Sequence, residues 1–168
     1  MKLRFFMPAM LASCVLSFTS GCAVMSKGRT QTVVVRSNPE GAVGRINGLE
    51  VGTTPFKIDL NRSSAYTIEL EKPGFAPVAT TVLPIANEYD KRFFRWGMDY
   101  DLGAMTDLTP NDLVVDLKPA VPPVAEAEDR FQEMTYRVLQ ADALLAAKEI
   151  SPADHKYLVA EIVKFYTN

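Results

Sequence analysis

Residues 37–55, SNPEGAVGRINGLEVGTTP, hold the densest run of turn signals in this chain. Asn47-Gly48 is the strongest of them, because a two-residue type I′ turn requires a positive φ at both of its central positions. Pro39 lacks a backbone N–H donor, so it fits at the entrance of a strand but not within a central strand. This stretch therefore predicts a small antiparallel β domain built from tight hairpins.

Short strands are predicted on both sides of these turns. Residues 31–37 are rich in β-branched side chains, and residues 65–72 alternate, with Tyr66, Ile68 and Leu70 facing inward. Further strands are predicted over 42–47, 49–52, 56–60, 75–83 and 113–117. Residues 84–112 break the alternation and are expected to leave the sheet. The β domain would then span residues 31–118.

Four short motifs follow one another along this region. They are Asn38-Pro39-Glu40-Gly41-Ala42, Ile46-Asn47-Gly48, Val51-Gly52-Thr53-Thr54-Pro55 and Lys72-Pro73-Gly74-Phe75. In this order they resemble the PEGA domain, over residues 33–83. The resemblance implies a small β-sandwich, common in bacterial surface and envelope proteins, and it brings no catalytic residues. Gly44 departs from the family pattern, which usually has a bulkier residue there, and this predicts a bulge or a close backbone approach.

The N-terminal residues indicate export. Lys2 and Arg4 precede a mostly apolar run over residues 5–18, which has the length of a signal-peptide core and is too short to span a membrane. Ser20-Gly21-Cys22 resembles the bacterial lipobox, although Thr19 stands where an aliphatic residue is usual. We therefore predict that residues 1–21 are a lipoprotein signal peptide, that Cys22 is lipidated, and that residues 22–30 form a polar tether. The alternative is an ordinary secretory signal that leaves Cys22 as a free thiol.

Location follows from the same resemblance. Ala23 replaces the aspartate that tends to retain proteobacterial lipoproteins at the inner membrane, so we expect the outer membrane, with the chain facing the periplasm. Cleavage before Cys22 removes two of the 18 basic residues and none of the 20 acidic ones, which leaves a net charge of −4. That charge does not favour nucleic acid as a partner.

The C-terminal part is predicted to be helical. Pro119, Pro122 and Pro123 indicate a stiff linker over residues 119–125, and a helical hairpin follows over residues 126–168. An apolar seam marks the first helix, at Ala127, Phe131, Met134, Val138, Ala141 and Leu145. The second helix is predicted to start with Ser151 as its N-cap, Pro152 in the first turn and an acidic Asp154. The seam could be buried within the chain or could pair with another copy or an envelope protein.

The sequence contains few residues in arrangements that are typical of catalytic or metal sites. His155 is the only histidine, and we expect it to be exposed, so neither a catalytic triad nor a zinc site has a convincing set of residues. Asp99, Asp101 and Asp107 resemble a calcium loop only superficially, because the later ligands of that pattern are missing. We expect no enzyme activity, no cofactor and no metal. The alternative is an enzyme or carbohydrate-binding module that uses these three aspartates.

The aromatic part of residues 84–112 is the segment most suited to a binding role. Phe93, Phe94, Trp96 and Tyr100 lie among cations, a composition that suits a partner surface or a membrane interface. The alternative is that these rings cover the open end of the sandwich. The fold predicted for the whole chain is mainly β, a small antiparallel β-sandwich with a C-terminal α-helical hairpin. Its predicted role is that of a non-enzymatic, lipid-anchored envelope protein that binds or scaffolds, or else an accessory subunit held in a complex through the hairpin.

Overall fold

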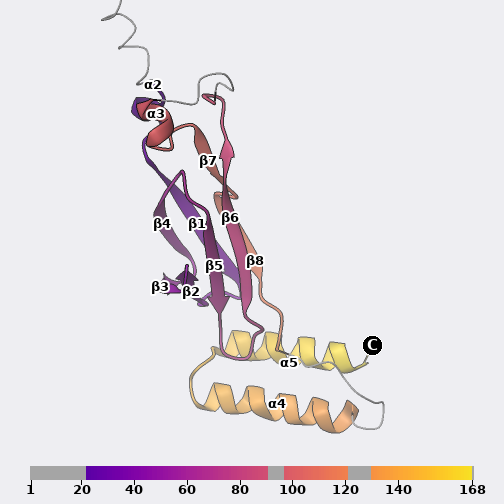
Figure 1. The fold of residues 1–168 in the computed structure, drawn as a ribbon. Helices are drawn as coiled ribbons and strands as arrows, with labels where there is room; N and C mark the ends of the chain where they lie inside the picture. The colour runs from indigo at the N-terminus through magenta and orange to yellow at the C-terminus, as the bar shows by residue number, and fades with distance from the viewer. Residues whose placement is uncertain (1–21, 91–96, 121–129, 168) are drawn as a thin grey trace, which may run out of the picture. The chain divides into compact units, whose positions relative to one another are not determined.

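A computed structural model describes residues 22–90, 97–120 and 130–167 of the chain. The fold is mainly β, with two sheets of a small β-sandwich and a C-terminal helical hairpin (Figure 1), which confirms the predicted fold class. The elements in chain order are α2 (Cys22–Lys27), β1 (Thr30–Asn38), β2 (Val43–Ile46), β3 (Leu49–Thr53), β4 (Phe56–Asn61), β5 (Tyr66–Glu71), β6 (Val78–Ala86), α3 (Met98–Asp101), β7 (Thr106–Thr109), β8 (Asp112–Asp116), α4 (Arg130–Ala146) and α5 (Pro152–Thr167).

The chain divides into two compact units. Of the described residues, the first unit takes those up to Val34 together with Lys57–Tyr66 and Thr81–Leu113, and it holds α2, α3 and β7. The second unit takes Val35–Phe56, Thr67–Thr80 and the chain from Val114 onward, and it holds β2, β3, α4 and α5.

The two sheets have the strand orders β4-β1-β8 and β3-β2-β5-β6-β7. In the second sheet, β2 is antiparallel to both of its neighbours, and β6 is antiparallel to β7. In the first sheet, Val34 N donates to Asn111 O and Leu117 N donates to Asn38 O. The partner of the later residue in β1, Asn38, also comes later in the chain than the partner of Val34, so β1 and β8 run parallel. A parallel neighbour needs a long connection, and here most of the β domain lies between the two strands.

The β2–β3 hairpin has the turn that its sequence predicts. Asn47 and Gly48 have φ angles of 50° and 82°, the two positive values that a type I′ turn requires. The register shifts between Gly44 and Arg45, and a Cβ added at Gly44 would collide with the ring of Phe56. The extra residue of this bulge is Val51 of β3, opposite Gly44 and Arg45, so the bulge lies in the partner strand. The group that approaches Gly44 closely is the Phe56 ring and not a backbone.

Each unit has its own buried apolar side chains. In the first unit these are Ala23, Val33, Leu60, Val82, Ala104, Leu108 and Leu113. In the second unit the strands and the loops beside them contribute Val35, Ala42, Ile46, Ile68, Leu70, Phe75, Val115 and Leu117, and the hairpin contributes Ala141, Ile150, Leu158, Ile162 and Tyr166.

Two segments differ from the sequence-based expectation. Residues 22–30 were expected to form an extended tether, but Cys22–Lys27 forms helix α2 and β1 already begins at Thr30. Residues 84–112 were expected to leave the sheet, but β6 continues to Ala86 and β7 pairs with it, Leu83 opposite Thr109 and Ala86 opposite Thr106. Backbone hydrogen bonds to a neighbouring strand, which no local pattern records, account for the second difference.

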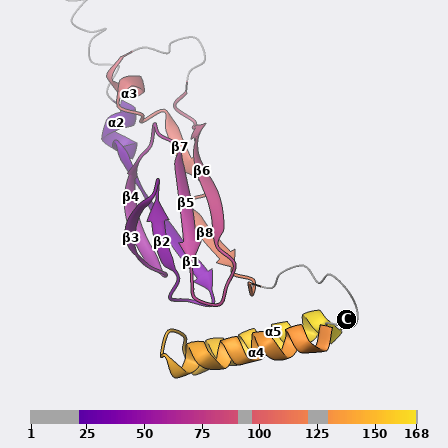
Figure 2. The same ribbon diagram turned by 60° about the horizontal axis from the view of Figure 1, so that its bottom comes forward.

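Helices α4 and α5 are in contact and run side by side in Figure 1, whereas in Figure 2 one lies in front of the other. Ala141 of the predicted seam is buried, whereas Phe131 near its other end is 73% exposed, so burial within the chain applies at Ala141 and not at Phe131. Phe131 lies ten positions before Ala141, and at about 100° per position its direction differs from that of Ala141 by about 80°. Within the described ranges, no helix is long and apolar enough to cross a membrane.

Candidate functional site

Helix α2, which begins at Cys22, is folded against helix α3 in the first unit. Ala23 is only 2% exposed, and Val24 N donates a hydrogen bond of 3.1 Å to Asp99 Oδ1. Asp99 is itself buried. A buried carboxylate that accepts from a free helical N–H satisfies both groups. The residue predicted to carry a lipid therefore starts a folded helix.

The other end of α2 is held by ion pairs. Lys27 Nζ lies 3.4 Å from Glu88 Oε1 and 3.5 Å from Asp107 Oδ2. The negative charge of Asp107 is the main reason that the pKa of Lys27 is raised above its ordinary value, and Glu88 adds to it. Both ends of α2 thus have partners in the rest of the first unit.

Arg62 contacts the other carboxylate oxygen of Asp107, the one that Lys27 does not contact. This guanidinium, in a side chain that is 10% exposed, contacts Asp107 Oδ1 at 2.5 Å. It also donates to Gln31 Oε1 at 2.7 Å and to the carbonyl of Thr30 at 3.1 Å. Asp107 is therefore engaged in a charged network at the start of β1, and it helps to fix α2.

The three aspartates considered for an enzyme have separate surroundings. Asp99 accepts from α2, Asp107 pairs with Arg62 and Lys27, and Asp101 is exposed. Across the described part of the chain, no three His, Cys, Asp or Glu side chains are grouped as metal ligands would be. Asp101 is exposed to solvent, whereas the packing of α2 on α3 buries Asp99.

Only one of the four predicted contact aromatics can be placed. Tyr100 lies in α3 and is 43% exposed, whereas Phe93, Phe94 and Trp96 lie outside the described residues. Two methionines that sequence reasoning passed over stand out beside it. Met25 of α2 is 90% exposed and Met98 of α3 is 64% exposed. Their signal in the sequence is weak, because Met25 follows small residues directly after Cys22 and Met98 lies in a stretch rich in aromatic residues and methionine.

In the second unit, Lys72 of the Lys72-Pro73-Gly74-Phe75 motif joins the β domain to the hairpin. Its Nζ lies 2.8 Å from Asp154 Oδ2, and the two side chains are 6% and 10% exposed. The same ammonium donates to the carbonyl of Glu40 and lies 5.9 Å from the ring centroid of Phe75. One buried cation thus connects the Glu40-Gly41 turn with the start of α5.

Asp154 also completes the N-terminal cap of α5, as its position predicts. Ser151 Oγ accepts from Asp154 N at 3.1 Å, and Asp154 Oδ2 accepts from both Ser151 N and Ser151 Oγ. Burial alone would raise the pKa of Asp154, but the hydrogen bonds from Lys72 and Ser151 outweigh it and lower the pKa below 3.8. The carboxylate is therefore ionised at neutral pH.

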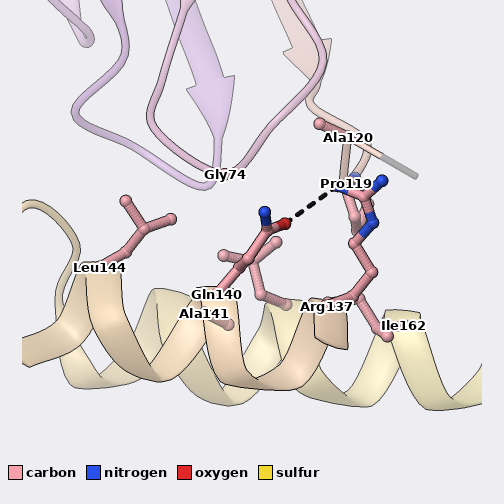
Figure 3. Close-up of a pocket in the computed structure, with 9 residues that line it drawn as sticks. Gly74, Pro119, Ala120, Arg137, Gln140, Ala141, Leu144 and Ile162 are labelled. Carbon is pink, nitrogen blue, oxygen red and sulfur yellow. Dashed lines mark hydrogen bonds between the residues drawn. The ribbon is translucent and has the colours of Figure 1, made fainter. Parts of the chain in front are cut away.

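A small pocket of about 90 Å³ lies where the Gly74 turn and Pro119-Ala120 face the hairpin (Figure 3). Its other lining residues are Arg137, Gln140, Ala141, Leu144, Leu158 and Ile162. Two of these residues are joined by a hydrogen bond, which Arg137 Nη1 donates to Gln140 Oε1 at 2.9 Å. Ligand pockets measure about 300–1,000 Å³, so this space suits a few water molecules better than a substrate.

His155 connects the two helices. Its Nε2 lies 2.7 Å from Asp142 Oδ1, and the side chain is 22% exposed. We predicted an exposed histidine, so it is less exposed than expected. The contact is part of the α4–α5 packing.

These features define a class of molecule: a small β-sandwich to which a helical hairpin is joined by a buried ion pair. Residues 30–95 match the family model of the PEGA domain. The match begins at the first residue of β1, includes all four motifs and suggests a protein of the cell-envelope type. No curated protein and no solved structure matches the chain.

Proposed function

We propose that this chain is a non-enzymatic, lipid-anchored protein of the bacterial cell envelope, held at the periplasmic face of the outer membrane, where it binds or scaffolds. The observation that carries the proposal is the lipobox-like Ser20-Gly21-Cys22, which precedes by a few residues the region that matches the PEGA domain, residues 30–95. The separate contacts of Asp99, Asp101 and Asp107 support a binding role over catalysis by these residues.

Metabolic labelling tests the anchor. Cells that express the full chain are grown with radiolabelled palmitate, and label on the protein is measured for the wild type, Cys22→Ala and Cys14→Ala. Cys14→Ala is the matched control, because it removes the other cysteine of the chain. We expect label on the wild type and on Cys14→Ala, and none on Cys22→Ala. Equal labelling of Cys22→Ala would contradict the proposal.

Fractionation tests the location. Membranes separated on a sucrose gradient should place the wild-type protein with the outer membrane. Ala23→Asp would be the usual variant for redirecting a lipoprotein, but Ala23 is 2% exposed, so a carboxylate there would destabilise α2. The wild-type distribution is therefore the informative measurement, and recovery with the inner membrane would overturn the outer-membrane assignment.

A second candidate role is that of an accessory subunit held through the hairpin. Tyr136 and Leu139 of α4 are 54% and 58% exposed, and Ala143 continues this face at helical spacing. A stripe of exposed apolar residues on one helical face suits a partner helix or a second copy.

Point substitution is the better test of this second role, because deleting residues 126–168 would also leave the buried Lys72 without its carboxylate. Leu139→Glu removes apolar surface and adds a charge, and Gln132→Glu is the control that adds the charge alone. After crosslinking in intact cells, Leu139→Glu should recover about ten-fold less partner than Gln132→Glu, a loss of about 1.4 kcal/mol. Equal recovery would remove support for this role.

A further inference from the structure

The residues next to Cys22 leave no free length between the anchor position and the fold. Helix α2 begins at Cys22 itself, and Ala23 and Val24 are already in contact with the first unit. A nine-residue extended tether would have spanned about 30 Å. Because α2 is folded, a lipid on Cys22 would bring α2 and its neighbour α3 to the bilayer surface together.

Helices α2 and α3 lie side by side in both ribbon views (Figures 1 and 2) and are in contact. Each presents a long apolar side chain that the described residues leave uncovered. Met25 is 90% exposed and Met98 is 64% exposed, with Tyr100 at 43%. Flexible thioether side chains and a tyrosine with one polar tip are suited to the boundary between headgroups and acyl chains.

The charges of α2 favour an apolar contact over an electrostatic one. The helix has no acidic residue in its first turn, and its one basic residue, Lys27, is paired with Glu88 and Asp107. A cation with two carboxylate partners within 3.5 Å has little charge left to attract anionic lipid. Contact at this face should therefore depend little on the anionic lipid content of the bilayer.

We propose that α2 and α3 form a face that contacts the phospholipid bilayer, with Met25 and Met98 entering the headgroup–acyl boundary beside the lipid on Cys22. This inference rests on the proposed lipidation of Cys22 and deepens it. The first unit is then in direct contact with the membrane surface and is not separated from it by a flexible linker.

Depth-dependent fluorescence quenching tests the face. The lipidated full chain is purified from bacterial membranes as Met25→Cys, Met98→Cys or Leu49→Cys, and the new thiol is labelled with an environment-sensitive dye. Cys14 is lost with the signal peptide, and the lipid blocks the Cys22 thiol. Leu49 is the matched control, because it is an apolar side chain that is 75% exposed and lies in β3, outside α2 and α3. The proteins are reconstituted into vesicles of phosphatidylethanolamine and phosphatidylglycerol that carry a doxyl-labelled lipid.

We expect dyes at positions 25 and 98 to shift to the blue and to be quenched at least roughly two-fold more than the dye at position 49, since an interfacial helix buries its apolar face about 5–10 Å deep. Replacing phosphatidylglycerol by phosphatidylcholine should leave the blue shift and the quenching at positions 25 and 98 unchanged. Flotation of the vesicles on a density gradient shows whether the protein is bound to them. If the protein floats with the vesicles but all three dyes are quenched equally, the proposed membrane face is wrong and the lipid anchor on Cys22 stands. If the protein does not float at all, the anchor itself is wrong and the inference falls with it.

Discussion

Lys72 shows how one side chain of a turn motif can organise a fold. Its ammonium binds the carbonyl of Glu40 and the carboxylate of Asp154, and the aromatic ring of Phe75 lies beside it. A buried cation is stabilised only when its charge is matched and its donors are used. The motif and the hairpin therefore depend on each other.

Asp154→Asn tests this dependence. Asparagine keeps the shape of the cap but removes the charge opposite Lys72, which should lower the free energy of unfolding by about 3–5 kcal/mol in urea unfolding at pH 7. Lys72→Met combined with Asp154→Asn removes both charges and should recover a large part of that loss. If the double variant is as unstable as the sum of the two single variants, the pair is not coupled.

The same pair predicts an acid dependence. Because the pKa of Asp154 is lowered in the folded protein, its contribution is complete above the ordinary carboxyl pKa of 3.8 and is lost as the pH falls below that value through the folded pKa. The difference in unfolding free energy between the wild type and Asp154→Asn should therefore be constant from pH 7 to pH 5 and shrink below about pH 4. A difference that stays constant down to pH 2 would show that the charge of Asp154 is not responsible.

Gly74 allows strain and packing to be separated. Its φ is +83°, and an added Cβ would lie 2.8 Å from Leu158 Cδ1 and 3.1 Å from Leu144 Cδ1. Gly48 has a φ of +82° with nothing within 4 Å. Gly48→Ala should cost about 1–2 kcal/mol from left-handed strain alone, and Gly74→Ala a further 1–3 kcal/mol from overpacking against the hairpin. Equal losses in chemical denaturation would mean that the hairpin does not pack on this turn.

At the scale of elements, α2 is a helix that tertiary contacts stabilise. Six residues are too few for an isolated helix in water, yet Cys22–Lys27 is helical because Ala23 is buried, Val24 N has an acceptor in Asp99, and Lys27 has two carboxylate partners. The helix is thus a product of the first unit and not of its own sequence.

Asp99→Ala should loosen α2. The variant leaves Val24 N without its acceptor, and a hydrogen bond to a charged group contributes about 1.5–3 kcal/mol. Amide hydrogen exchange in residues 22–28 should become at least about ten-fold faster. Asp101→Ala, which removes an exposed carboxylate from the same helix α3, should leave the exchange unchanged. Similar exchange in both variants would contradict the docking of α2 on α3.

The sequence predicts those elements whose cause is local. The Asn47-Gly48 turn and the cap at Ser151 depend on residues within a few positions of one another, and both were predicted. Helix α2, the pairing of β7 with β6 and the Lys72–Asp154 pair depend on groups far apart in the chain. A single sequence contains no signal for those contacts.

At the scale of the whole molecule, the match to the PEGA domain over residues 30–95 follows closely after Cys22, the residue for which we propose lipidation. The most direct measurement is the mass of the protein extracted from bacterial membranes, together with that of its N-terminal peptide. We predict a chain that begins at Cys22 and carries a diacylglyceryl group on Sγ. A chain that begins at another residue, or one with a free thiol at Cys22, would contradict the account.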